Sequence, residues 1–269
     1  MSNNVFIHHH LGLGDHFHCN GVVRYLIKNK FVNKKIKLFA KKRYVSMIQF
    51  MYRDIKDLEV VPVTNDEKRE IDEVNDIISK DDIIEKIGFD YFVKNKNKDK
   101  TIDMIFYEQF NIDYSKRFEL TYWKRDYSKE EKLYNKLVEK KNYVFIHDDR
   151  SRGFVIKDEN ISSDLQIIRN SKEYSIFDFS KIIENAKEIH VMESSSRCML
   201  EYLNTKNSKH FLYKFKSDKR GSIPFYKEKK IIVGSSKEWK IIEIDNIKTN
   251  NIFSKIKKYF TQNKSYDQE

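Results

Sequence analysis

The residues best suited to chemistry lie in a turn close to the amino terminus. Gly12 and Gly14 follow a short apolar run, and Asp15 and His16 come directly after the second glycine. Apolar residues at helical spacing begin here, so the turn brings Asp15 and His16 to a helix N-terminus, where backbone N–H groups and the helix dipole attract anions. Such a carboxylate normally has a lowered pKa and can act as a base or accept a hydrogen bond from a ligand hydroxyl. The alternative is that Asp15 is a plain N-cap residue.

The two glycines do not complete a dinucleotide-binding fingerprint, which needs a third glycine and an acidic residue about twenty positions later. Phe17 stands at the position of the third glycine, and Lys34, Lys35 and Lys37 occupy the region of the acid. The chain also lacks the GxxxxGK[ST] pattern of a phosphate-binding loop. The sequence therefore disfavours a nicotinamide or flavin site, and we expect no bound cofactor.

Five of the eight histidines cluster around this turn, as they would at a metal site. They are His8, His9, His10, His16 and His18. Their spacing does not suit a metal, because there is no HExxH motif or companion cysteine pair, and adjacent strand residues point to opposite faces. We therefore expect no metal, and we expect His8 or His10 to end a strand at the floor of a cleft.

A second group of candidate residues follows an apolar run in the second half of the chain. Arg150 and Arg152 lie beside Gly153 in the loop after the strand expected at 143–146. Ligands of open α/β sheets bind at the carboxyl ends of strands, and guanidinium groups match phosphate oxygens. We favour anion binding here. The alternative is a solvated loop in which the arginines and the neighbouring aspartates neutralise one another.

A third group lies between a later strand and a helix. Glu193 is followed by Ser194, Ser195 and Ser196. Hydroxyls and free backbone N–H groups at a helix N-terminus can hold a phosphate, and the Glu193 carboxylate could accept hydrogen bonds from both hydroxyls of a ribose. The alternative is ordinary helix capping by Ser194 or Ser195.

The two cysteines, Cys19 and Cys198, are too few for a disulfide framework or a zinc ribbon. Cys198 follows Arg197, but the neighbouring sequence offers it no recognisable base. We therefore expect Cys198 to serve in core packing.

Strands alternate with helices from the first residues onward, and the alternation restarts in mid-chain. Strands are predicted at 5–7, 35–40, 58–63, 143–146, 189–192, 210–213 and 230–233. Helices are predicted from residue 15 onward, at 42–52, around Ile83–Ile87, and at 102–110, 129–140, 175–187, 197–203 and 254–260. This order predicts an α/β fold with two Rossmann-like domains facing across a cleft. The N-terminal domain would span 1–128 and the C-terminal domain 141–248, and a terminal helix with a disordered tail would occupy 249–269.

The charge balance indicates which classes of ligand the chain can bind. Lys and Arg exceed Asp and Glu by 52 to 41, a net charge of +11, but acidic and basic residues are interspersed throughout. Because no sustained basic block occurs, we do not expect nucleic-acid binding, and the excess suits anionic ligands or an anionic membrane surface. No apolar leader opens the chain, and no run approaches the roughly 18 apolar residues of a membrane span. We expect a cytoplasmic protein with at most peripheral contact to the inner membrane face.

Three segments of the chain resemble bacterial glycosyltransferases of the two-domain GT-B fold. HLGLGDHFHCNGVVRYL resembles the amino-terminal glycine turn and helix of these enzymes, and FIHDDRSRG resembles the first strand and loop of their C-terminal domain. SIFDFSKIIENAKEIHVMESSSRCMLEYL resembles their nucleotide-sugar segment. Within this fold the chain is similar to the heptosyltransferases and the GT-B fucosyltransferases, which serve capsule and lipopolysaccharide biosynthesis.

The resemblance implies transfer of a sugar from a nucleotide-diphosphate donor to a glycan or lipid-linked glycan acceptor. It implies that Asp15 is the base that deprotonates the acceptor hydroxyl, and the neighbouring His16 is the other residue that could serve as this base. The donor-binding residues expected with it are Gly12, Gly14, Arg150, Arg152, Glu193, Ser194, Ser195 and Ser196. His10 and Asn20 are expected to bind the acceptor. Since no D-x-D motif occurs, we expect a metal-free reaction in which helix dipoles and arginines stabilise the departing diphosphate.

A second hypothesis belongs to another class of protein. The chain could be a GT-B-like domain without catalytic activity, or a basic protein that binds nucleic acid or a membrane surface. Stabilisation by one nucleoside diphosphate would favour the transferase. Salt-sensitive binding to any RNA would favour the alternative.

Overall fold

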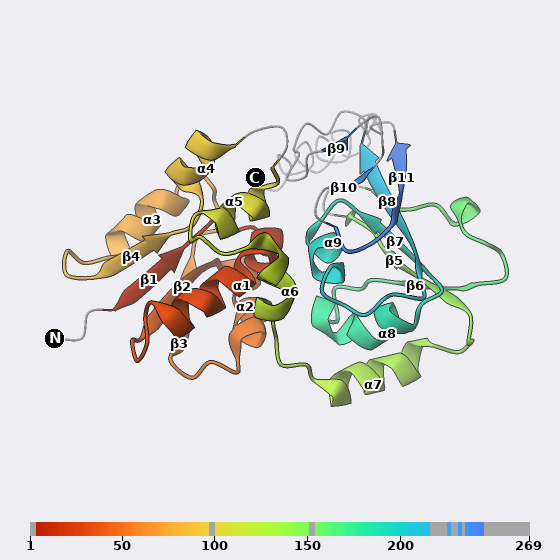
Figure 1. The fold of residues 1–269 in the computed structure, drawn as a ribbon. Coiled ribbons are helices and arrows are strands. Elements are labelled where there is room, and N and C mark those ends of the chain that lie inside the picture. The colour runs from red at the N-terminus through yellow and green to blue at the C-terminus, as the bar shows by residue number, and fades with distance from the viewer. Residues whose placement is uncertain are drawn as a thin grey trace, which may run out of the picture.

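The structure is a computed structural model that describes residues 4–96, 100–150, 154–215, 225–226, 231–232 and 235–244. Within these residues the strands form two parallel sheets and one short antiparallel pair, with helices packed around the sheets. Figure 1 shows the two sheets in separate halves of the molecule, joined at the base by the helix labelled α7. The predicted α/β class with two Rossmann-like domains is confirmed. Below, each sheet with its helices is called the N-terminal or the C-terminal domain.

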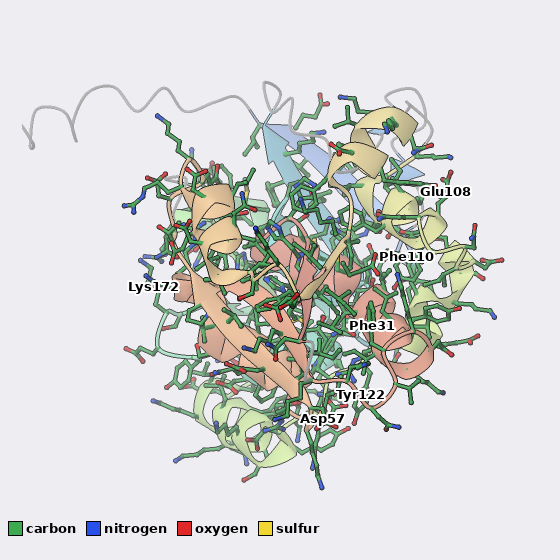
Figure 2. All side chains as sticks on the ribbon, turned by 90° about the vertical axis from the view of Figure 1, so that its left-hand side faces the viewer. Phe31, Asp57, Glu108, Phe110, Tyr122 and Lys172 are labelled. Atoms are coloured by element: carbon green, nitrogen blue, oxygen red, sulfur yellow. The ribbon has the colours of Figure 1, made fainter. Side chains whose placement is uncertain are left out.

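The sheet of the N-terminal domain has the strand order β3-β2-β1-β4, and all its neighbouring strands are parallel. The strands are β1 (Val5–His8), β2 (Ile36–Lys41), β3 (Leu58–Val63) and β4 (Ile83–Lys86). All four residues of β1 are buried, because the strand lies between two neighbours and an apolar run suits a sheet covered on both faces. Phe31 and Asp57, labelled in Figure 2, lie at the amino ends of the strands. The opposite, carboxyl edge therefore carries the glycine turn.

The helices of this domain run from one to nearly five turns. They are α1 (Leu13–Asn29), α2 (Val45–Tyr52), α3 (Glu70–Ile77), α4 (Phe89–Asn95), α5 (Ile102–Glu108) and α6 (Arg117–Leu120). On α1 the predicted apolar face, which includes Val22, Val23 and Leu26, is buried in the domain core. This packing fixes the helix, and with it the direction in which its N-terminus points.

The helix predicted around Ile83–Ile87 is wrong, because these residues form strand β4 and the turn that follows it. β4 pairs in parallel with β1, and Ile84 stands opposite Phe6. The spacing of Ile83, Ile84 and Ile87 fits one helix face as well as a short strand, and the pairing with the central strand decides between them.

The sheet of the C-terminal domain has the strand order β11-β8-β7-β5-β6 and is also parallel throughout. Its strands are β5 (Tyr143–His147), β6 (Gln166–Arg169), β7 (Glu188–Met192), β8 (Lys209–Phe215) and β11 (Trp239–Ile244). Its helices are α7 (Tyr127–Leu137), α8 (Ser180–Asn185) and α9 (Ser195–Leu200). The predicted capping box of Ser175 and Asp178 is present, but it opens a short 3₁₀ helix, Ile176–Phe179, that runs into α8.

The other elements of this domain were predicted only in part. Strands β6 and β11 were not predicted from the sequence. Of the strand expected at 230–233, the described part is β10 (Ile231–Ile232), which pairs antiparallel with β9 (Phe225–Tyr226). The helix expected at 254–260 and the tail after it lie outside the described residues.

The two domains share one apolar core, to which α1 and the segments that precede α7 and α8 contribute aromatic side chains. An aromatic cluster lies in this core. It consists of Phe17 from α1, Trp123 from the segment before α7, and Phe177 from the 3₁₀ helix that precedes α8. Their ring centroids are 5.7 to 5.8 Å apart. Figure 1 shows α1 and α6 on one side of the domain boundary and α9 on the other. The domains are thus packed against each other along α1.

Gly21, in the middle of α1, is expected to resist replacement by alanine, although alanine normally stabilises a helix interior. A Cβ atom at this position would lie 2.2 Å from the Tyr107 hydroxyl oxygen and 3.0 Å from Leu120 Cβ. We expect Gly21→Ala to lower the free energy of unfolding by about 1–3 kcal/mol in urea denaturation. Adding Tyr107→Phe removes the nearest atom and should recover part of the loss. An unchanged or raised stability in Gly21→Ala would contradict this packing.

Candidate active site

Asp15 lies in the first turn of α1, directly beyond the carboxyl end of β1. Gly12 is the N-cap residue of the helix, and the Asp15 carboxylate accepts a hydrogen bond from its backbone N–H. The interpretation of Asp15 as the N-cap is therefore wrong. A Cβ atom on Gly12 would lie 2.5 Å from Asp15 Oδ2. Glycine at position 12 thus leaves the space in which the carboxylate sits.

The pKa of Asp15 is raised, mainly because burial disfavours the charged form. His18, His10 and Lys41 oppose this shift through their charges, and the Gly12 hydrogen bond opposes it too. The lowered pKa expected at a helix N-terminus is wrong here, since burial outweighs the cationic surroundings. A raised pKa makes an aspartate a stronger base, which suits proton abstraction.

His16 and His9 form a neutral pair inside the N-terminal domain. Burial lowers the pKa of His9 to about 3, and burial together with His9 lowers the pKa of His16 well below its usual value. The two rings meet edge to face with centroids 4.3 Å apart. His16 is fully buried, so it lies behind Asp15 rather than at a surface where a ligand could reach it.

The carboxyl edge of the sheet also carries a buried ion pair that was not predicted from the sequence. The Lys41 ammonium nitrogen, at the end of β2, lies 3.2 Å from one carboxylate oxygen of Glu70, and His8 Nε2 lies 4.0 Å from the other oxygen.

Within the described residues, no group of three or more His, Cys, Asp or Glu side chains is arranged to hold a metal ion.

The His10 ring packs against the ring of Phe89, which lies in a turn with unusual backbone angles. Gly88 and Phe89 have φ values of 89° and 47°, both in the left-handed region that is rare for a bulky residue such as Phe89. This turn places the Phe89 ring against His10, with centroids 5.2 Å apart and planes 17° from parallel. Backbone strain of this kind is characteristic of functional sites.

The serine segment lies at the start of α9, at the carboxyl end of β7. Ser194 is the N-cap residue of α9, but its side chain makes no capping hydrogen bond. The hydroxyl oxygens of Ser194 and Ser196 are buried and have no hydrogen-bond partner among the described residues. Glu193 accepts a hydrogen bond from Arg197 Nε at 3.1 Å, so its carboxylate already has a cationic partner.

Arg150 lies at the carboxyl end of β5 with a side chain that is 61% exposed, so a ligand can reach it. The neighbouring Asp148 is buried and is engaged by Arg169 of β6, at 2.7 Å and 2.8 Å, and by the backbone N–H of Ile156. Arg150 itself is 3.8 Å from Asp148. The aspartate is therefore neutralised mainly by Arg169, which leaves the charge of Arg150 facing solvent. Arg152 lies outside the described residues.

The structure brings the glycine turn and the serine segment together across the domain boundary. A Cβ atom on Gly14 would lie 3.3 Å from Cys198 Sγ and 3.7 Å from the Ser195 Cα atom. A side chain at position 14 would crowd the Cys198 sulfur, because the backbone of α1 approaches α9 closely. At this point the two domains touch.

Asn20 lies away from this contact. It is fully buried, and its Oδ1 accepts hydrogen bonds from the Tyr122 backbone N–H at 2.9 Å and from Arg24 Nε at 3.2 Å. Arg24 in turn pairs with Asp54. Asn20 and Arg24 lie one helical turn apart on α1, and these contacts tie the helix to its neighbours.

No protein-family model and no curated protein matches the sequence. Among solved structures, the glycosyl transferase family 9 protein from Veillonella parvula DSM 2008 is similar, with a TM-score of 0.53 at 8% identity, over 100% of this chain and 92% of that chain. The E. coli heptosyltransferase WaaC with ADP gives a TM-score of 0.44 at 10% identity, over 97% of this chain and 98% of that chain. E. coli ADP-heptose lps heptosyltransferase II gives 0.43 at 10% identity, over 98% of this chain and 100% of that chain.

Helices of the described part of the chain are all too short or too polar to cross a bilayer.

Because the sequence identities to the solved structures are only 8–10%, the comparison with them concerns the fold. The two parallel sheets, their order along the chain and the overall similarity to the Veillonella protein agree with the resemblance drawn from the sequence. The chain therefore has a GT-B-like fold.

Proposed function

We propose that the protein is a glycosyltransferase. It would move a sugar from a nucleotide-diphosphate donor to a glycan or lipid-linked glycan acceptor without a metal ion. One observation carries the proposal: the turn that bears the half-buried carboxylate of Asp15 packs directly against the serine segment of α9. Such a transfer needs a base beside the acceptor hydroxyl and hydrogen-bond donors beside the departing diphosphate. Asp15 would be the base, and the serine segment would supply donors from the other domain.

The donor would bind to the C-terminal domain. The exposed guanidinium group of Arg150 would contact the diphosphate, and the unpartnered hydroxyls of Ser194 and Ser196 would donate hydrogen bonds to it. As the sugar leaves the diphosphate, negative charge develops on the phosphate oxygens. A cation and hydrogen-bond donors that contact the diphosphate would stabilise that charge.

The acceptor would bind to the carboxyl edge of the N-terminal sheet. Asp15 would take the proton from the acceptor hydroxyl, and its raised pKa suits this role. His10, packed on Phe89, would line the acceptor side. His16 and Asn20 would support the site from inside the domain, since both are buried.

Nucleotide binding can be tested by thermal shift with UDP, GDP, CDP and ADP. We expect one of these diphosphates to raise the unfolding temperature at micromolar to millimolar concentration, because a ligand that binds only the folded state stabilises it. Arg150→Ala is expected to weaken that nucleotide by about 10- to 100-fold, the effect of losing one hydrogen bond between charged groups.

The matched control is Arg43→Ala, which removes an exposed arginine of the N-terminal domain and should leave nucleotide affinity at the wild-type value. Two results would contradict the proposal. The first is that none of the four diphosphates shifts the unfolding temperature. The second is tight, salt-sensitive binding to RNA of any sequence, which would support the alternative of a basic binding protein.

A further inference from the structure

Three titratable side chains from three helices form a continuous chain at the domain boundary. His18 Nε2, on α1, lies 3.2 Å from Cys198 Sγ, on α9. His18 Nδ1 lies 3.4 Å from Asp103 Oδ2, on α5. The same Asp103 oxygen accepts a hydrogen bond from the Tyr114 hydroxyl at 2.5 Å. A thiol, an imidazole and a carboxylate in this order are the parts of an activated nucleophile.

The charges around this chain favour a protonated imidazole. Burial lowers the pKa of His18, but Cys198 and Asp103 raise it to well above its usual value. Burial likewise disfavours the charged form of Asp103, yet His18, Thr101 and Tyr114 hold its pKa well below the usual range. A second cation lies close by, since Arg197 Nη2 is 3.8 Å from Cys198 Sγ. Arg197 also pairs with Glu193 and Glu201, so the sulfur lies between the His18 imidazole and a guanidinium group that already has carboxylate partners.

We propose that Cys198 is a peroxide-reactive cysteine positioned at the contact between α1 and α9, with His18 and Arg197 beside its sulfur. The oxidant class is a hydroperoxide, of which hydrogen peroxide is the simplest. The thiolate attacks one peroxide oxygen, an S–O bond forms and the O–O bond breaks. The departing hydroxide takes the proton of His18, so that the products are a sulfenic acid, water and neutral imidazole.

The size of the reagent follows from the packing. Cys198 is 5% exposed, so a small oxidant reaches it more readily than a bulky electrophile. A Cβ atom on Gly14 would lie only 3.3 Å from the sulfur. An oxygen added to the sulfur would crowd this close approach of α1 to α9, so we expect oxidation to loosen the contact between the two domains.

The other cysteine is a built-in control. Cys19 is also on α1 but is 0% exposed in the core of the N-terminal domain. Burial, together with the charges of Asp15 and Asp103, raises the pKa of Cys19 well above its usual value. Cys19 is thus held as an unreactive thiol in the same molecule.

The test exposes the native protein to hydrogen peroxide, removes the excess with catalase, and unfolds the protein in dimedone, which labels sulfenic acids. Mass spectrometry then compares the two cysteine peptides. We expect Cys198 to be labelled about tenfold faster than Cys19 or more, because an ordinary thiol is only a few per cent thiolate near neutral pH. We also expect the oxidised protein to unfold at a lower temperature, and a thiol reductant to reverse the change.

His18→Gln and Asp103→Asn test the positioning roles, and the ultraviolet absorbance of the thiolate is the readout that a merely structural role would not change. We expect this absorbance in the wild type and its loss in Cys198→Ser and in His18→Gln, with a drop of about tenfold or more in the rate of Cys198 oxidation in His18→Gln. Asp103→Asn should lower both in the same direction. Tyr114→Phe keeps all three charged groups and should leave both close to wild type.

Equal labelling of Cys198 and Cys19 in the native protein would overturn the proposal. So would a wild-type protein without thiolate absorbance, a measurement that holds even where a variant fails to fold. A His18→Gln variant that folds and oxidises at the wild-type rate would also remove the role assigned to His18. None of these measurements needs a nucleotide or a sugar, so their outcome is independent of the proposed transferase activity.

Discussion

Asp15→Asn is expected to lower turnover by about 10²- to 10⁴-fold, the usual effect of removing a general base. The amide keeps the shape of the side chain and can still accept the hydrogen bond from the Gly12 N–H, but it cannot take a proton. Donor affinity should stay close to wild type, because Asp15 is on the domain opposite the proposed donor residues. The measurement pairs turnover of the sugar nucleotide selected by the diphosphate panel with thermal shift by the corresponding diphosphate.

The pH dependence of turnover gives a second readout of the same role. Since burial raises the pKa of Asp15, the acidic limb of the pH–rate profile should lie above the range of an ordinary aspartate. Activity should fall as the pH drops through this limb, because the base becomes protonated. The residual activity of Asp15→Asn should lack the limb.

Asp90→Asn is the matched control, since Asp90 is also a first-turn carboxylate but is exposed on α4. It should keep wild-type turnover. Wild-type turnover in Asp15→Asn would contradict the role of base. Loss of both turnover and nucleotide binding would instead make Asp15 a residue that the domain contact needs.

The first strand, turn and helix could be predicted from the sequence because each has a strong local signal. An apolar run ends at two glycines, and a helical spacing of apolar residues begins at once, so β1 and α1 fall close to the predicted positions. The capping box at Ser175 is equally local, and it too is present. Strand β4 has no such signal, since its identity depends on pairing with a strand some eighty residues earlier.

The candidate site could be predicted only as far as its parts are continuous in sequence. The glycine turn and the serine segment each stand out locally, and the structure packs them together. The partners of these residues come from elsewhere in the chain. His18 and Cys198 are 180 residues apart, so no sequence pattern shows that Cys198 has an imidazole beside it. The prediction that Cys198 packs in the core is confirmed, since the residue belongs to the apolar core, but its contacts with His18 and Arg197 could not be predicted.

The same limit applies to electrostatics. A helix N-terminus predicts a lowered pKa for Asp15, while the structure shows that burial raises it. Arg150 and the nearby aspartates predict mutual neutralisation or anion binding, and the choice depends on Arg169, which occupies Asp148 from strand β6. Because strand β6 was not predicted from the sequence, neither was this pairing.

Arg125→Met is expected to destabilise the protein by about 3–5 kcal/mol, the usual cost of leaving a buried charge without its partner. Arg125 lies in the segment that joins the two domains. Its guanidinium group donates to Glu130 of α7, at 2.9 Å from Nε to Oε1, and to Glu184 of α8 at 2.7 Å. The Glu130 side chain is only 2% exposed, so water cannot replace the arginine. The variant should unfold at lower urea concentration than the wild type.

The double variant Arg125→Met with Glu130→Leu separates the two contributions. It removes both charges and leaves apolar side chains of similar size, so we expect it to recover most of the lost stability, as buried ion pairs replaced by apolar groups often do. Lys129→Met is the matched control. Lys129 is an exposed cation on α7, the helix that also holds Glu130, and its ammonium nitrogen lies 3.8 Å from an Asp126 carboxylate oxygen. Its effect should stay below about 1 kcal/mol, as for surface ion pairs in general. If Arg125→Met were as mild as this control, Glu130 would have to be solvated after all. The joining segment would then be held by its other contacts, which include the aromatic cluster around Trp123 and the hydrogen bonds that Arg53 donates to the Lys124 carbonyl oxygen.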